Sequence, residues 1–139
     1  MDSARFALFV KQDCQTCTLL VPVFERLRES LPDLAIYVQD DPRFLSSAGA
    51  AYDKTLEKSF RADIEITPTL IRMTGQSETG RVCGWVRDEW RNITGIAKLG
   101  QDLPAYSPGC GSKTRQPGVW APGGAIRRLA TEEPPNPDR

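Results

Sequence analysis

Residues 6–27 read FALFVKQDCQTCTLLVPVFERL and contain the C-x-x-C motif Cys14-Gln15-Thr16-Cys17. The five apolar residues before the motif, 6–10, have the length and composition of a buried strand. After it, from 18 to 30, apolar residues recur at helical spacing. The sequence therefore predicts two thiols at a strand-to-helix turn. There the positive end of the helix dipole favours a thiolate of low pKa.

The composition excludes several classes of function. The chain has 139 residues, with 18 basic and 18 acidic side chains and no histidine. This length suits one domain, and the balanced charge argues against a nucleic-acid surface or an electrostatic membrane patch. No apolar run approaches the ~18 residues that a membrane span needs. Without histidine, imidazole bases and His zinc ligands are excluded.

The cysteine pattern is typical of a reducing compartment. Cys14 and Cys17 form one close pair, while Cys83 and Cys110 stand alone, unlike a disulfide-dense secreted scaffold. The apolar run at 6–10 is shorter than a signal-peptide core. We therefore expect a cytoplasmic protein, unless a leader was removed. In such a protein a close cysteine pair is catalytic or metal-binding rather than structural.

The chain divides by composition into a domain at 1–99 and a tail at 100–139. The tail holds more than half of the eleven prolines and eleven glycines, and few periodic apolar residues. Such a segment cannot offset its chain entropy alone. We expect it to lie across the domain or to be disordered, with Val119 and Trp120 as anchors. One helical turn at 125–130 and a loose end at 132–139 complete this prediction.

The remaining pattern within 1–99 predicts an α/β domain with a mixed four-stranded sheet and flanking helices. Besides 6–10, the predicted strands are 34–38, 69–73 and 81–86, with a hairpin loop at 75–80. Besides the first helix, the predicted helical segments are 44–62, broken in two near Gly49, and 87–95. Trp85 and Trp90 are expected in the core.

Two prolines complete a recognisable pattern. Pro22 lies inside the first helix, where it removes a hydrogen bond and should kink that helix, and Pro68 opens the strand at 69–73. Together with the cysteine motif, they resemble the thioredoxin superfamily over roughly residues 5–99. That family carries the same motif, the same helix-kinking proline and a cis-proline before a central strand. Gly84 matches its glycine in the last strand.

The resemblance implies a fold and a chemistry. Cys14 would be the attacking thiol and Cys17 the resolving thiol, which displaces the reduced product from a mixed disulfide. A cis Thr67-Pro68 bond would turn backbone groups toward an extended substrate beside Cys14. The partners would be a disulfide-containing protein or small molecule and a reducing partner, either a reductase or a low-molecular-weight thiol. No cofactor is implied, and we expect a monomer.

The chain also departs from typical thioredoxins. Gln15-Thr16 replaces the usual Gly-Pro between the cysteines, so the direction of electron transfer stays open. The tryptophan usually found before the motif is absent, and Leu8 stands where a buried aspartate is expected. Only residues 1–5 precede the first strand. The core is therefore nearer to the minimal, glutaredoxin-like version of the fold.

The two single cysteines receive different interpretations. Cys83, in a predicted strand, is expected to be a buried small hydrophobe. Cys110 lies in the turn-rich stretch SPGCGS at 107–112, where a thiol is expected to be accessible. It is either an accessory redox thiol that reaches Cys14 or a plain tail cysteine. The flanking glycines allow a close backbone approach but suit an ordinary loop equally well.

Two functional hypotheses follow. The first is a thiol–disulfide oxidoreductase that reduces protein or small-molecule disulfides through Cys14 and Cys17. The second is a redox-inactive thioredoxin-like binding module, or a soft-metal carrier that binds Cu(I) or Zn through Cys14, Cys17 and Cys110. A conventional zinc site is not expected, because the sequence has neither a second close cysteine pair nor a histidine.

Overall fold

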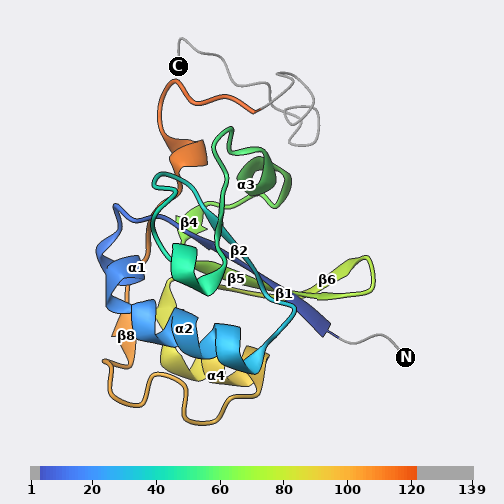
Figure 1. Cartoon of the computed structure of the whole chain (residues 1–139), viewed down its shortest axis with the longest axis vertical. Coiled ribbons are helices and arrows are strands. Elements are labelled where there is room, and N and C mark those ends of the chain that lie inside the picture. Colours follow the sequence, from blue (N-terminus) through green and yellow to red (C-terminus); the bar gives the residue numbers. More distant parts are fainter. Residues whose placement is uncertain (1–3, 122–139) are drawn as a thin grey trace.

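The computed structural model describes residues 4–121 and is built around a five-stranded mixed sheet with the order β3-β2-β1-β5-β6 (Figure 1). β1 runs parallel to β2 and antiparallel to β5, and β6 is antiparallel to β5. The strands are β1 (Ala4–Val10), β2 (Ala35–Val38), β3 (Ala51–Tyr52), β5 (Thr69–Thr74) and β6 (Ser77–Cys83). The sheet exceeds the predicted four strands because the two-residue β3 pairs with β2.

Successive side chains of β1 point alternately into two hydrophobic layers, one on each face of the sheet. Phe6, Leu8 and Val10 belong to the main core, whereas Phe9 packs on the opposite face in a smaller cluster. This follows from strand geometry, in which successive side chains point to opposite faces. The main core lies between the sheet and two helices, α2 (Val21–Ser30) and α4 (Arg87–Thr94). Figure 1 shows both helices on the same side of the sheet.

The first helix is interrupted rather than kinked. α1 (Gln15–Leu19) ends at Leu19 with Leu20 as its C-cap, and Pro22 lies in the first turn of α2. Proline is tolerated there because its missing N–H would have no partner within the helix. The helix that begins at the cysteine motif therefore has five residues, shorter than the periodicity predicts.

The prediction of two helical pieces at 44–62 is confirmed at the break near Gly49, whose φ is 80°, and at 57–61, and it is wrong elsewhere. This insert contains a 3-10 turn (Ser46–Ala48), β3 and the short helix α3 (Glu57–Arg61). Leu56 has a φ of 62°, which a continuous helix cannot contain. The carboxylate of the buried Asp53 accepts hydrogen bonds from the backbone N–H groups of Lys58 and Ser59, so helix formation is delayed to α3.

The predicted strand at 81–86 is divided at Gly84, whose φ is 66°. It forms the end of β6 and then β7 (Trp85–Val86), and the turn before β6 is shorter than the predicted loop at 75–80. Trp85 and Trp90 are fully buried in the core, with ring centroids 5.5 Å apart. No helix within residues 4–121 is long and apolar enough to cross a membrane.

The described part of the tail, 100–121, lies across the domain. β8 (Tyr106–Ser107) pairs with β7, and β9 (Cys110–Gly111) pairs with β4 (Ile66–Thr67). In Figure 1 the orange segment after β8 runs past α1 toward α3. The helical turn expected at 125–130 and the loose end expected at 132–139 lie outside the described residues.

A buried polar network anchors the tail after β9. The side chain of Gln39 donates to the hydroxyl groups of Ser59, at 3.0 Å, and Ser112, at 2.8 Å, and accepts from the backbone N–H of Lys113 at 2.9 Å. The Thr114 hydroxyl donates to the carbonyl of Ile64 at 2.8 Å. Buried polar groups that are fully paired fix one arrangement, because any displacement leaves them unpaired.

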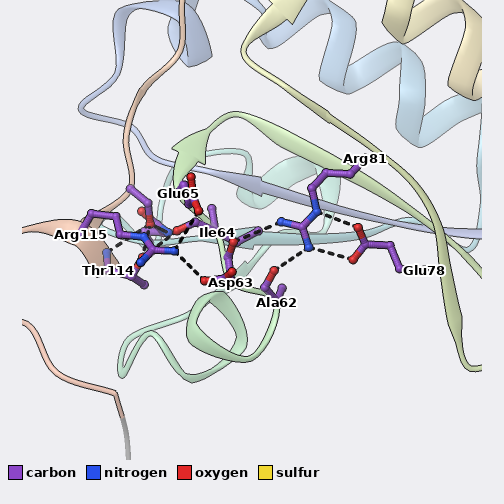
Figure 2. A network of polar contacts seen from close by, with 10 residues as sticks. Ala62, Asp63, Ile64, Glu65, Glu78, Arg81, Thr114 and Arg115 are labelled. Atoms are coloured by element: carbon purple, nitrogen blue, oxygen red, sulfur yellow. Dashed lines mark hydrogen bonds and ion pairs between the residues drawn. The ribbon is translucent and has the colours of Figure 1, made fainter. Parts of the chain in front are cut away.

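Ion pairs and apolar contacts extend this anchor. Arg115 bonds Asp63 at 2.6 Å and lies 3.5 Å from Glu65, as Figure 2 shows. Val119, a predicted anchor, packs against the cluster of Leu56, Phe60 and Ala121. Trp120, the other predicted anchor, remains 41% exposed.

Candidate functional site: a cluster of three thiols

The turn after β1 presents Cys14 as the N-cap of α1. Its sulfur accepts a hydrogen bond from the backbone N–H of Cys17 at 3.3 Å. The preceding loop is fixed by Asp40, whose two carboxylate oxygens accept from the backbone N–H groups of Gln12, at 2.7 Å, and Asp13, at 2.9 Å. Cys14 is only 4% exposed and Cys17 is fully buried, and both are free thiols.

The two motif thiols differ strongly in acidity. The Cys17 thiol donates a hydrogen bond to Cys14, which is the main reason that the pKa of Cys14 falls from an ordinary 9.0 to about 5. A hydrogen bond from Cys110 and the backbone N–H of Cys17 act in the same direction, while burial opposes them. Burial and the neighbouring Cys14 raise the pKa of Cys17. One thiol is thus a thiolate at neutral pH, and its partner keeps its proton.

Thr67 and Pro68 lie beside the reactive sulfur. The Thr67–Pro68 peptide bond is cis, and both residues are buried. In its thiol form, Cys14 donates to the carbonyl oxygen of Thr67 at a sulfur–oxygen distance of 3.6 Å. The structure therefore brings together the cysteine motif and the segment that the resemblance assigns to substrate binding.

Cys110 joins this site from the tail. It lies on β9, directly opposite Thr67 in the antiparallel pair with β4, and not in an irregular turn. The thiol is half-buried and packs against the core cluster that contains Cys14 and Cys17. Burial is the main reason that its pKa is raised, and the hydrogen bond to Cys14 and the negative charge of Cys14 add to it. The expectation of a freely accessible thiol is therefore wrong, because β4 pairs with its strand.

Cys83 does not belong to the site. It ends β6 opposite Thr69 of β5, and its side chain is exposed. The prediction of a buried structural cysteine is therefore wrong. Strand alternation alone could not fix its face, because Gly84 interrupts the strand at the next residue.

Sequence reasoning missed two residues that hold the tail over the motif. Lys11 is buried, and its ammonium group donates to the carbonyl oxygen of Gly111 at 2.6 Å. The Thr16 hydroxyl lies 2.7 Å from the Ser107 hydroxyl and also donates to the carbonyl oxygen of Pro108. Thr16 lies in the motif and Lys11 shortly before it, but their partners are about a hundred residues further along the chain, and no local pattern reveals such pairs.

The soft-metal alternative requires a cluster of ligands. Among residues 4–121, no group of three or more His, Cys, Asp or Glu side chains is placed to hold a metal ion. Cys14 instead interacts with the thiols of Cys17 and Cys110 and with backbone groups.

Comparisons with known proteins give likenesses of structure only. No family model matches the sequence, and no curated protein matches it. A secreted Mycobacterium tuberculosis disulfide oxidoreductase homologous to E. coli DsbE is 14% identical, with 66% of this chain and 80% of that chain covered and a TM-score of 0.52. An uncharacterized conserved protein from Geobacillus kaustophilus is 16% identical, with 79% and 76% covered and a TM-score of 0.54.

A third solved structure is the short form of thioredoxin F from spinach chloroplast. It is 25% identical, with 70% of this chain and 78% of that chain covered, at a TM-score of 0.47. The described sheet, with its mixed strand directions and flanking helices, agrees with the architecture that the sequence predicts. The chain has the thioredoxin-like fold.

Proposed function

We propose that this protein is a thiol–disulfide oxidoreductase in which Cys14 attacks the substrate and Cys17 resolves the mixed disulfide. The proposal rests on the difference in pKa between the two adjacent thiols. Cys14 has a pKa of about 5, whereas burial raises the pKa of Cys17. Only a thiolate is a competent nucleophile, so Cys14 reacts first at neutral pH.

The reaction proceeds by two thiol–disulfide exchanges. The Cys14 thiolate attacks one sulfur of a substrate disulfide, forms a mixed disulfide and releases the other sulfur as a thiolate. Cys17 then loses its proton and attacks the Cys14 sulfur, which releases the second substrate thiolate. The substrate is reduced by two electrons, and the protein is left with a Cys14–Cys17 disulfide. A reductase or a low-molecular-weight thiol returns this disulfide to two thiols.

The proposed substrate is a protein or small-molecule disulfide that lies along Thr67 and Pro68. The carbonyl oxygen of Thr67 lies 3.6 Å from the Cys14 sulfur, so a substrate chain that replaced β9 on Thr67 would lie beside Cys14. We propose reduction in the cytoplasm as the physiological direction, with the protein acting as a monomer. The close Cys14–Cys17 pair supports a dithiol reaction.

Reduction of insulin by dithiothreitol tests this proposal. The wild-type protein should accelerate the reaction, and Cys14→Ser should abolish the acceleration because it removes the nucleophile. Cys83→Ser is the matched control and should keep full activity, because its thiol is exposed and outside the site. Equal activity of Cys14→Ser and the wild type would contradict the proposal. A redox-inactive binding module would show no acceleration in any variant.

A further inference from the structure

The strand that carries Cys110 occupies the same edge that flanks the reactive thiol. Thr67 pairs with Cys110 across the β4–β9 ladder, and its hydroxyl donates to the Cys110 carbonyl oxygen at 3.4 Å. The carbonyl oxygen of the same Thr67 lies 3.6 Å from the Cys14 sulfur. Thr67 therefore pairs with the tail strand and also lies beside the nucleophile, which places Cys110 next to Cys14.

Two features show that this docking is specific. A Cβ atom on Gly109 would lie 2.2 Å from the Cγ2 atom of Ile66 and 2.7 Å from the carbonyl oxygen of Thr67, so the approach requires glycine. On the other side of Cys110, the buried Lys11 donates to the Gly111 carbonyl oxygen at 2.6 Å. The residues before and after Cys110 are thus both held against the site.

Burial distinguishes the two thiols that could attack a mixed disulfide on Cys14. Cys17 is fully buried, and removing its proton there leaves a charge without solvent. Cys110 is only half-buried. The negative charge of Cys14, which helps to raise the pKa of Cys110, disappears once Cys14 is bonded to a substrate sulfur. Cys110 then ionises more readily than it does in the reduced protein.

From this arrangement we infer that Cys110 is a third redox thiol, which offers a second route beside Cys17 by resolving mixed disulfides on Cys14 as a Cys14–Cys110 disulfide. The inference rests on the proposed function. Since Cys14 is 4% exposed and Cys110 lies beside it, we infer that a substrate disulfide displaces β9 as it reaches the Cys14 sulfur. When β9 returns, the Cys110 thiolate attacks the Cys14 sulfur, and the substrate leaves as a thiolate. The substrate disulfide is the oxidant, and the two cysteines are oxidised together.

Attack by Cys110 on Cys14 is efficient because both cysteines belong to the same chain. A group held on the same chain acts at an effective concentration on the order of millimolar or more. That exceeds a micromolar pool of released small thiol by roughly a thousandfold. The Cys14–Cys110 disulfide should therefore form in preference to reversal of the first exchange, even when Cys17 is absent.

The experiment uses full-length, reduced Cys17→Ser protein and one equivalent of oxidised glutathione at pH 7. After acid quench and alkylation, peptide mapping without reductant measures each species with time. We expect the glutathione adduct on Cys14 to convert into a Cys14–Cys110 disulfide. In Cys17→Ser/Cys110→Ser the adduct should persist roughly tenfold longer or more, because the tethered thiol is gone. Cys17→Ser/Cys83→Ser is the matched control and should behave like Cys17→Ser.

The outcomes separate this inference from the proposed function. A glutathione adduct that persists on Cys14 of Cys17→Ser, with Cys110 free, would overturn the third-thiol inference and leave attack by Cys14 intact. Absence of any adduct on Cys14 in Cys17→Ser/Cys110→Ser would overturn the proposed function and this inference with it. Cys17→Ala, mapped in the same way, guards against misfolding caused by a buried serine hydroxyl.

Discussion

Cys83 and Cys110 occupy related places on the two sides of Pro68, yet their surroundings differ. Cys83 of β6 is the register partner of Thr69, and Cys110 of β9 is the register partner of Thr67. The first is exposed, while the second is half-buried and packs with the motif thiols. The comparison teaches that pairing with the residue before Pro68, rather than any local property of the cysteine, brings a thiol to Cys14.

The largest expected effect is on the pH dependence of Cys14. A pKa of about 5 makes its thiolate nearly complete at pH 7, against about 1% for a thiol at the ordinary 9.0, a difference of roughly a hundredfold. Because the pKa is lowered, reactivity should fall only as the pH drops through about 5. Alkylation of the Cys14 peptide by iodoacetamide between pH 4 and 9, followed by mass spectrometry, measures this midpoint.

The same titration distinguishes the two single cysteines by their effect on the pKa of Cys14. Cys110→Ser changes a group that donates a hydrogen bond to Cys14, so the midpoint should move. Cys83→Ser should leave it in place. A wild-type midpoint near 9 would contradict the lowered pKa of Cys14. Equal midpoint shifts in both variants would contradict the assignment of Cys110 to the thiol cluster.

The next largest effect concerns the cover over Cys14. Gly109→Ala places a methyl group 2.7 Å from the backbone oxygen of Thr67, and overpacking of this kind costs about 1–3 kcal/mol. Since 1.4 kcal/mol corresponds to a factor of ten, alkylation of Cys14 should accelerate roughly tenfold as β9 leaves β4. The rate is measured above pH 7, where ionisation no longer limits it.

Gly111→Ala is the matched control for this variant. It lies on the same short strand, but a Cβ atom there meets nothing within 4 Å. The variant should therefore react like the wild type. If the two alanine variants react equally, the close contact at Gly109 does not hold the strand over the thiol.

The contrast between these regions also explains what the sequence could predict. The strand–motif–helix unit was predictable because each part carries a local signal, namely an apolar run, two close cysteines and helical spacing. The interaction of β9 with β4 carries none, since a two-residue strand has no measurable period and its partner lies over forty residues away. Only the glycines beside Cys110 indicated a close approach.

The prediction for the insert between β2 and β4 was largely wrong, for a different reason. Its apolar spacing at Leu56 and Phe60 is genuine, because both side chains are buried in one cluster. The helix nevertheless begins only after Leu56, where the backbone has a positive φ and the carboxylate of Asp53 supplies the first N–H partners. Periodicity identifies the buried face, but the backbone hydrogen bonds decide where the helix starts.

A smaller effect is expected from Lys11→Met. This change removes the donor to the Gly111 carbonyl oxygen but keeps most of the buried side-chain volume. The change also removes the cost of keeping a buried ammonium group away from water, so the net loss should be about 1 kcal/mol. Cys14 alkylation should then accelerate several-fold, less than in Gly109→Ala. Lys54→Met, at an exposed lysine, should not alter the rate.

The smallest effect is expected from Cys83→Ser, and it tests the other half of the comparison. Substitution of an exposed side chain usually changes the free energy of unfolding by less than about 0.5 kcal/mol, so urea unfolding of the reduced protein should be unchanged. The yield of Cys14–Cys110 disulfide should also be unchanged. A loss of stability above 1 kcal/mol would mean that Cys83 is packed as the sequence predicted. A changed disulfide yield would mean that the two sides of Pro68 are not chemically separate.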